Sequence, residues 1–331
     1  MPIFVTRPKI AFISQPEYFR FIYENELEDV ADVMEFKYNY SMLAEAFSSL
    51  IDFNADINFF FRGEFVPNVV LEQLRGKKVN LSSEPFPRVI DGRTVYTIDS
   101  LDRYLTFRTI QTKSYDYVFH YDAASFPFFE WDGLKLSGEF AFPVATSIYK
   151  PTIVPKIWDV FFIGRSTPRR EIFFGRLKHY YHFLHISHGI WGPDLVDYMN
   201  KSRICLNAHA ENEVSWEPRL QMMLSCGAFV ISEKITPNKY FRPGVDYVEV
   251  SRYDEMFNVA EYFLQHEEER NEIAQNGFNR VRELLDSKKV FTDFIQKLDR
   301  NEYPLFSGVS RHKYLPKYSK FLKFMKKMRG H

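Results

Sequence analysis

Short apolar runs alternate with amphipathic helical patterns along the first 140 residues of the chain. The runs have the length and the β-branched and aromatic content of strands. The predicted strands are 9–14, 55–65, 77–82 and 115–122, and the predicted helices are 41–51, 68–76 and 100–113. Gly76 is placed to end one helix, and Ser100 to cap the start of another. This alternation predicts a parallel sheet covered by helices on both faces.

A proline-rich segment at 140–156 interrupts the alternation. It reads FAFPVATSIYKPTIVPK, with three prolines and no helical period, which is typical of a connection between domains. A second alternation follows it. Its predicted strands are 158–164, 181–187, 203–209, 228–233 and 245–250, and its predicted helices are 168–180, 193–202, 217–227, 253–265 and 267–285.

We therefore expect an α/β protein with two Rossmann-like domains facing each other across a cleft. The expected domains are 1–142 and 158–306, joined by a crossover at 143–157 and followed by a tail at 307–331. Ligands of such sheets bind beyond the carboxyl ends of the parallel strands, so the chemistry should lie there.

Composition narrows the class of protein. Lys plus Arg and Asp plus Glu both number 43, so the net charge gives no reason to expect nucleic-acid binding. Two cysteines in 331 residues make a disulfide framework improbable and favour a reducing compartment. No signal-peptide pattern opens the chain, and no apolar run reaches the roughly 20 residues of a membrane span. A cytoplasmic protein, peripheral to a membrane at most, is expected.

The first candidate for chemistry is FIGRSTPRRE at 162–171, where a strand runs through Gly164 into a new helix. Glycine permits a tight turn, and the free N–H groups of a helix N-terminus favour an anion. Arg165 and either Arg169 or Arg170 add forked donors that suit phosphate oxygens. The alternative is a capped surface helix with solvated arginines.

The second candidate is EPRLQMMLSCGAFVIS at 217–232, a helix followed by a buried strand. Ser215 is a possible N-cap, and Gly227 ends the helix. Arg219 stands in the first turn, where the helix dipole disfavours a cation, so an anionic partner is expected. Either a bound phosphate or the neighbouring Glu217 would meet that need.

Candidate catalytic groups follow two predicted strands. His120 and Asp122 stand where a strand of the first domain ends, the position of a general base, although Asp122 equally suits a cap of the next segment. His188 lies in a loop after another strand. Because His185 points opposite to His182 and His188 on a strand, the three cannot converge on a metal.

Three motifs are absent from the sequence. No GxGxxG follows the first strand, so a nicotinamide or flavin dinucleotide site is not supported. There is no P-loop, and no Asp-x-Asp of the kind that holds a divalent metal on a sugar nucleotide. We expect neither a resident cofactor nor a metal.

Several segments of the second half follow one another in the order of a known family. They are FIG with its arginines, ICLNAH, RLQMMLSCG, AFVIS, YFRPGVDYVEV and the acidic helices after 262. From Trp158 to about Phe294 the chain resembles the C-terminal domain of GT-B glycosyltransferases, most closely the group that includes the CgeB-like spore-maturation proteins. The resemblance implies a nucleotide-sugar domain at 158–306 and an acceptor domain at 1–142.

The resemblance also implies roles for individual residues. Gly164, Arg165, Arg170 and Arg219 would hold the donor diphosphate without an obligatory metal, and Gly227 would shape the nucleotide pocket. The family usually has glutamate, which contacts the ribose, where this chain has Met222. Methionine cannot accept that hydrogen bond. Glu213 or Glu217 would then have to replace the contact.

The C-terminal tail differs in kind from the rest. Residues 311–331 hold six lysines, two arginines and no acidic residue. After Pro316 an apolar stripe is spaced as on one helical face, typical of a basic amphipathic helix on an anionic membrane. The alternative is a helix packed on the body of the protein with a solvated lysine face.

The sequence thus predicts a glycosyltransferase. It would move a sugar from a nucleotide-diphosphate sugar to a glycan or lipid-linked glycan, with an anionic membrane surface as a further partner. Two alternatives stay open at this point, a catalytically degenerate GT-B binding or scaffold protein and a nucleotide-sugar epimerase of similar architecture.

Overall fold

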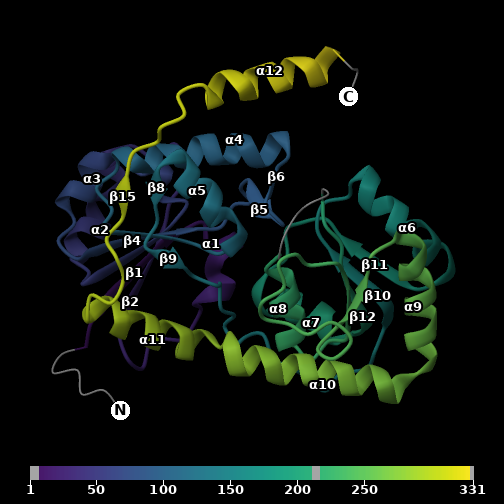
Figure 1. Cartoon of the computed structure of the whole chain (residues 1–331). Helices are drawn as coiled ribbons and strands as arrows, with labels where there is room; N and C mark the ends of the chain where they lie inside the picture. Colours follow the sequence, from purple (N-terminus) through teal and green to yellow (C-terminus); the bar gives the residue numbers. More distant parts are fainter. Residues whose placement is uncertain (1–6, 211–216, 329–331) are drawn as a thin grey trace. The chain divides into compact units, whose positions relative to one another are not determined.

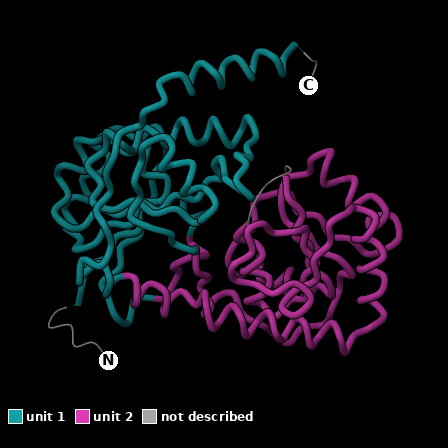
Figure 2. Tube along the Cα trace, in the orientation of Figure 1, with its two compact units in different colours: residues 1–19, 27–141, 295–331 teal, residues 20–26, 142–294 magenta. Residues whose placement is uncertain are grey.

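A computed structural model describes residues 7–210 and 217–328 of the chain. The chain forms two compact units, coloured separately in Figure 2. Unit 1 comprises residues 1–19, 27–141 and 295–331, and unit 2 comprises residues 20–26 and 142–294. Each unit is built around its own parallel sheet, as the alternating pattern predicts.

The sheet of unit 1 has six strands in the order β2-β1-β3-β4-β7-β9, and every neighbouring pair is parallel. The inner strands β1 and β3 are buried almost throughout, which explains their continuous apolar runs. The edge strand β2 is largely exposed, and its mixed sequence gave no strand signal. The strands are β1 (Lys9–Ser14), β2 (Asp32–Lys37), β3 (Ile57–Phe61), β4 (Lys77–Ser82), β7 (Tyr117–His120) and β9 (Gly138–Glu139).

Aromatic side chains fill much of the core of unit 1. Phe86, Tyr104, Phe107 and Phe129 are buried against one another, with ring centroids 4.8–6.5 Å apart. The helices of the unit are α1 (Pro16–Phe19), α2 (Ser48–Phe53), α3 (Asn68–Gln73), α4 (Ile98–Phe107) and α5 (Phe126–Asp132). Short 3-10 turns are η2 (Ala44–Phe47), η3 (Gly63–Phe65), η4 (Arg108–Thr112) and η5 (Ala123–Ser125).

The sheet of unit 2 has five strands in the order β11-β10-β12-β13-β14, again all parallel. Its strands are β10 (Trp158–Ile163), β11 (Phe183–Ile186), β12 (Ser202–Asn207), β13 (Val230–Glu233) and β14 (Val248–Val250). Its helices are α6 (Pro168–Tyr180), α7 (Gly192–Asn200), α8 (Arg219–Ser225), α9 (Tyr253–Gln265) and α10 (Glu267–Leu284), preceded by η1 (Arg20–Ile22). Figure 1 labels most of these elements.

Two predicted helix ends are wrong. Gly76 does not cap α3, which ends at Gln73; a Cβ on Gly76 would lie 2.1 Å from the Ala55 carbonyl oxygen, so glycine permits a close backbone approach. Ser100 is not the N-cap of α4. Thr97 is the cap, and Ser100 completes a capping box with it three residues later.

The chain divides into the two units near residue 142, and a short segment on each side of that point belongs to the other unit. Residues 20–26 belong to unit 2, where the Phe21 carbonyl accepts a hydrogen bond from the Ala145 N–H at 2.7 Å. Residues 295–306 belong to unit 1, because the end of α11 (Ser287–Asp299) and the following turn pack there. Phe119 contacts Tyr303 at 4.9 Å between ring centroids.

The C-terminal segment also packs on unit 1. The short strand β15 (Ser307–Gly308) pairs antiparallel with β8 (Leu134–Lys135). The helix α12 (Leu315–Met328) then runs beside α4, as Figure 1 shows, with Leu315 and Ser319 buried against the unit. The packed helix that the sequence left as an alternative is therefore present. In the described part of the chain, no helix is long and apolar enough to cross a membrane.

Candidate functional site

The strand order of unit 2 reverses its direction at β10. The chain proceeds from β10 to β11 on one side and then returns to β12 on the other. Ligands of open parallel sheets bind at this reversal, beyond the carboxyl ends of the strands. Gly164 follows β10 and Ala208 follows β12, so the candidate site begins between them.

Gly164 lets an arginine approach the backbone. Its φ is +143°, a conformation that side chains disfavour, and an added Cβ would lie 2.6 Å from Arg219 Nη1 and 3.1 Å from Phe162 Cζ. Arg219 Nη1 donates a hydrogen bond of 2.6 Å to the Ile163 carbonyl. Glycine is required here, because any larger residue would displace the guanidinium.

Arg170 approaches the same place from α6. The Thr167 side chain caps this helix by accepting a hydrogen bond from the Arg170 N–H at 3.2 Å. The guanidinium of Arg170 donates to the Ala208 carbonyl at 2.9 Å and to the Arg165 carbonyl at 2.8 Å. Arg170 and Arg219 lie 5.0 and 5.1 Å from the centroid of the Phe162 ring, so the two guanidinium groups converge on it.

Two carboxylates balance part of this positive charge. Glu217 forms an ion pair with Arg219 and lies 3.5 Å from Arg170 and 3.6 Å from His209 Nδ1. Glu233, at the end of β13, binds Arg169 at 2.7 Å and accepts the His209 backbone N–H at 2.6 Å. Three arginines, at 169, 170 and 219, therefore pair with two carboxylates in this part of unit 2.

Burial makes the two inner arginines costly to keep charged. Burial and the charge of Arg170 lower the pKa of Arg219 well below its usual value. Burial is also the main cause that lowers the pKa of Arg170, to about 10. Arg219 Nε has no hydrogen-bond partner among the described residues. A bound anion would relieve the repulsion and meet this donor.

The remaining predicted donor-site residues lie in different surroundings. Arg165 is exposed on the loop before α6. Gly227 has φ +65° after α8, where a Cβ would lie 3.1 Å from Pro151 Cγ. Met222 is half-buried in α8. Their contacts with phosphate or nucleotide stay predictions, as does the nucleotide-binding role of Glu217; Glu213 lies outside the described residues.

The helix that carries Arg219 is shorter than predicted. α8 begins at Arg219, with Pro218 at its N-cap position, and Ser215, the expected cap, lies outside the described residues. Pro218 gives no side-chain cap hydrogen bond. The position of Arg219 therefore depends on its contacts with Ile163 and Glu217.

His120 ends β7 of unit 1 and is fully buried. Its ring stacks on Phe86 with centroids 4.8 Å apart, and burial lowers its pKa to about 3. The imidazole is therefore neutral at physiological pH. An imidazole with so low a pKa is a weak base. Proton abstraction by His120 would therefore require different surroundings when substrate is bound.

Asp122 has the structural role that the sequence offered as an alternative. Its carboxylate accepts the Ala124 N–H at 3.0 Å and caps η5, and it lies 3.9 Å from Arg88 Nε. His188 is exposed in the loop after β11. The catalytic roles of His120, Asp122 and His188 stay predictions.

Two residues of the candidate site were missed from the sequence. Glu233 binds Arg169, and His209 lies beside Glu217. In the sequence, Glu233 and His209 are each the last residue of an apolar strand pattern. A charged or ionisable residue that closes a buried parallel strand is a usable signal, because that end of the strand faces the crevice. The described residues contain no group of three His, Cys, Asp or Glu side chains arranged to hold a metal ion.

Comparisons with known proteins agree on the fold. The profile of a family described as "Glycosyl transferase-like" matches residues 167–296, which contain Arg170, Glu217 and Arg219. A comparison with curated protein sequences finds no match. The family match covers α6 to α11 and lies almost entirely within unit 2.

Solved structures resemble the chain over most of its length. HepE from Anabaena in complex with UDP-glucose is 12% identical, covering 88% of this chain and 100% of HepE with a TM-score of 0.61. Sucrose-phosphate synthase from Thermosynechococcus elongatus is 11% identical, covering 89% and 99% with a TM-score of 0.61. An alpha-glucosyltransferase in complex with UDP and a 13-mer DNA is 11% identical, covering 88% and 99% with a TM-score of 0.63. This chain therefore has the fold of the GT-B glycosyltransferases.

Proposed function

We propose that this protein is a glycosyltransferase that takes a sugar from a nucleotide-diphosphate donor, most simply a UDP-sugar. The observation that carries the proposal is the convergence of Arg170 and Arg219 beside Gly164 at the strand reversal of unit 2. HepE and an alpha-glucosyltransferase of the same fold are described in complex with UDP-glucose, which supports UDP as the nucleotide.

The arginines supply the chemistry that departure of the nucleotide requires. Negative charge grows on the diphosphate as the bond to the sugar breaks, and fixed cations stabilise that charge. Arg170 and Arg219 are held by backbone carbonyls and by the Phe162 ring, so they need little reorganisation. We propose that they act without an obligatory metal ion.

We propose that unit 1 binds the acceptor, a glycan or a lipid-linked glycan. His120, Asp122 and, from unit 2, His188 are the proposed catalytic groups, of which only His188 is exposed in this state. We further propose that the basic segment 311–331 holds the protein at an anionic membrane, where a lipid-linked acceptor would be found.

A panel of nucleotides and nucleotide sugars tests the donor proposal. UDP or a UDP-sugar is expected to raise the melting temperature, because only the folded state binds it. Slow hydrolysis of the bound donor is expected without an acceptor, and chelation of divalent metals should not prevent it. A melting temperature unchanged by every compound would contradict the proposal.

The same panel separates the alternatives. Stabilisation without hydrolysis or transfer would indicate a degenerate binding protein, a reading that Met222 supports because it lacks the family's ribose contact. Release of an epimerised nucleotide sugar would indicate an epimerase.

A further inference from the structure

Unit 1 contains an apolar pocket that the donor site does not explain. Its volume is about 420 Å³, within the usual range for small-molecule sites. Four elements wall it: the β5–β6 hairpin (Arg88–Ile90 and Arg93–Val95), α4, α5 and the start of α12. The lining residues are Pro87, Val89, Gly92, Thr94, Tyr96, Leu101, Pro127, Phe128, Trp131, Tyr314, Leu315 and Tyr318.

The lining favours a hydrocarbon over a sugar. It contains no charged side chain. The hydroxyl groups of Tyr96 and Tyr318 are hydrogen-bonded to each other at 2.7 Å, which satisfies both. Thr94, Tyr314 and the indole N–H of Trp131 are the remaining polar side-chain groups of the lining. A sugar ring requires several polar partners once it leaves water, whereas an alkyl chain requires none.

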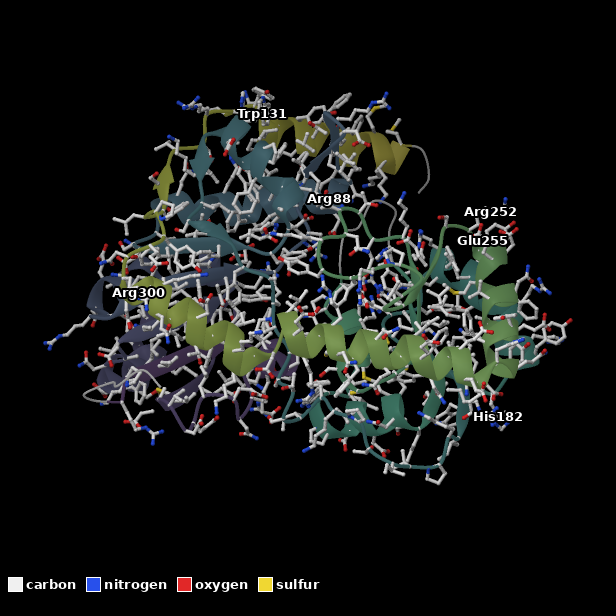
Figure 3. The ribbon with its side chains drawn as sticks, turned by 60° about the horizontal axis from the view of Figure 1, so that its bottom comes forward. Arg88, Trp131, His182, Arg252, Glu255 and Arg300 are labelled. Carbon is white, nitrogen blue, oxygen red and sulfur yellow. The ribbon has the colours of Figure 1, made fainter. Side chains whose placement is uncertain are left out.

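Trp131 fixes one side of the pocket. It is labelled in Figure 3, and its indole stacks on His312 with ring centroids 3.8 Å apart. Its neighbour Phe128 lies 5.2 Å away between centroids. The C-terminal segment therefore joins the wall before α12 begins, and the pocket depends on the tail being in place.

The helix α12 has two different faces. Leu315 and Ser319 are buried, and Leu322 packs partly against the core of unit 1. Its outer face exposes a second apolar stripe, in which Phe321 is 56% and Phe324 is 59% exposed. The stripe continues with Tyr318 and Met328.

Lysines flank the exposed stripe. Lys323 pairs with Asp102 of α4 at 2.6 Å, but Lys317, Lys320, Lys326 and Lys327 are exposed. Large apolar side chains exposed among lysines are typical of a surface that meets anionic lipid. Tyr318 belongs both to this helix and to the wall of the pocket, so the two features are continuous.

We propose that this pocket binds the hydrocarbon chain of a phosphate-linked lipid, the anchor of the acceptor, while the lysines of 313–327 bind its phosphate. The assignment to the acceptor rests on the proposed function; the binding itself does not. Charge complementarity selects this occupant, because residues 311–331 hold eight basic side chains and no acidic one. It also refines the expectation for the tail, since α12 would shape the acceptor site as well as contact the membrane.

Calorimetry of the full-length protein with alkyl phosphates tests the proposal. From hexyl to dodecyl phosphate, kept below micelle formation, each added methylene should tighten binding about fourfold until the pocket is filled. Affinity should then level off. Affinity that does not depend on chain length, or absence of binding, would overturn the proposal.

A bulky substitution locates the site. Thr94 is exposed on β6 opposite Val89, and both line the pocket. Thr94→Trp should fill it and weaken decyl phosphate binding at least about tenfold. Thr109→Trp, at an exposed threonine outside the pocket, should bind as the original protein does. Equal affinity in both variants, each with an unchanged melting temperature, would contradict the proposal.

A charge reversal tests the phosphate contact. Lys317→Glu should weaken decyl phosphate but leave a neutral decyl glucoside unchanged, and an equal loss for both would overturn the role of the lysine. UDP binding is measured in the same samples. If decyl phosphate binds and no nucleotide does, the donor proposal is wrong, whereas the proposed lipid binding by the pocket is supported. If UDP binds and decyl phosphate does not, the pocket assignment fails alone.

Discussion

The two units share one sheet topology but differ at the point where the strand order reverses. In unit 2, the carboxyl ends of β10 and β12 are followed by Gly164, Ala208 and the converging Arg170 and Arg219. In unit 1, the corresponding reversal lies between β1 and β3. There Phe19 of α1 stacks on Phe61, the last residue of β3, with centroids 4.8 Å apart.

Charge at the two reversals differs as well. Arg62 follows β3 in a left-handed conformation, with φ +61°. It binds Glu64 at 2.8 Å and Glu84 at 2.5 Å, and Glu84 also pairs with Arg103. In unit 2, Arg170 and Arg219 share Glu217. We therefore expect the proposed diphosphate site in unit 2 and not in unit 1, because the side chains at the reversal, and not the fold, decide what binds there.

The largest expected effect concerns a feature that both units share, a buried neutral histidine at the carboxyl edge of the sheet. Burial lowers the pKa of His120 to about 3 and that of His209 to about 4. Unfolded chains bind protons below about pH 6.5, so the stabilisation is complete above that pH. It should fall by on the order of 1.4 kcal/mol per histidine for each pH unit below it.

Urea unfolding between pH 7 and pH 4.5 measures this slope. His120→Leu and His209→Gln should each reduce it, and the two changes should add because the residues lie in different units. A slope that neither variant alters would contradict the assignment.

The next effect concerns the arginine at the strand reversal of each unit. Arg219→Ala removes a charge-assisted contact worth about 1.5–3 kcal/mol, so UDP affinity should fall about ten- to a hundredfold. Arg62→Ala removes the arginine at the reversal of unit 1 and should leave UDP affinity unchanged. Calorimetry measures the UDP affinity of both variants. An equal loss of affinity in the two would contradict the proposal that only unit 2 binds the diphosphate.

Gly164→Ala tests the position of the Arg219 guanidinium without removing its charge. The new Cβ would lie 2.6 Å from Arg219 Nη1 at a φ of +143°. Displacement of the guanidinium should weaken UDP binding about tenfold, with a loss of stability of about 1–3 kcal/mol from backbone strain. Gly92→Ala is a control for positive φ alone, because a Cβ there meets open space. It should leave UDP affinity unchanged.

Glu217→Gln separates two roles of one carboxylate. Its pairing with Arg219 and Arg170 predicts a lower melting temperature without nucleotide, since two buried cations lose their counter-charge. UDP should restore most of that loss. An unchanged melting temperature with weaker UDP binding would instead indicate a direct contact of Glu217 with the nucleotide.

The smallest effect concerns Met222. If the missing family glutamate limits donor binding, Met222→Glu should add one hydrogen bond to the ribose and tighten UDP about tenfold, worth about 1.5 kcal/mol. Met222→Gln is the uncharged control. Weaker UDP binding in Met222→Glu would mean that α8 presents this position differently from the family pattern.

Local patterns were sufficient for much of unit 2. The predicted helix at 168–180 matches α6, and the predicted strand at 158–164 matches β10 to within one residue, because apolar period and a Thr-Pro start are local signals. The same local signals pointed to Arg219 and to either Arg169 or Arg170 as candidates, and the phosphate-binding roles stay predictions. The edge strand β2 was missed because its side chains are mostly exposed.

Contacts between residues that are far apart in the sequence could not be predicted from local patterns. Gly76 is required by Ala55, and residues 295–306 are assigned to unit 1 by contacts such as that of Tyr303 with Phe119. Neither partner is near in sequence. The pocket of unit 1 was missed for the same reason, since its walls come from three regions between 87 and 318.

The anchoring of the two arginines has a consequence for the kinetics of donor binding. Arg219 is held by the Ile163 carbonyl and Arg170 by those of Ala208 and Arg165 before any ligand arrives. Long side chains normally lose about 0.5–1.5 kcal/mol of rotamer freedom each when a ligand immobilises them. Here folding has already restricted them. Association with the proposed donor should therefore be limited by encounter, with an on-rate that falls as ionic strength rises.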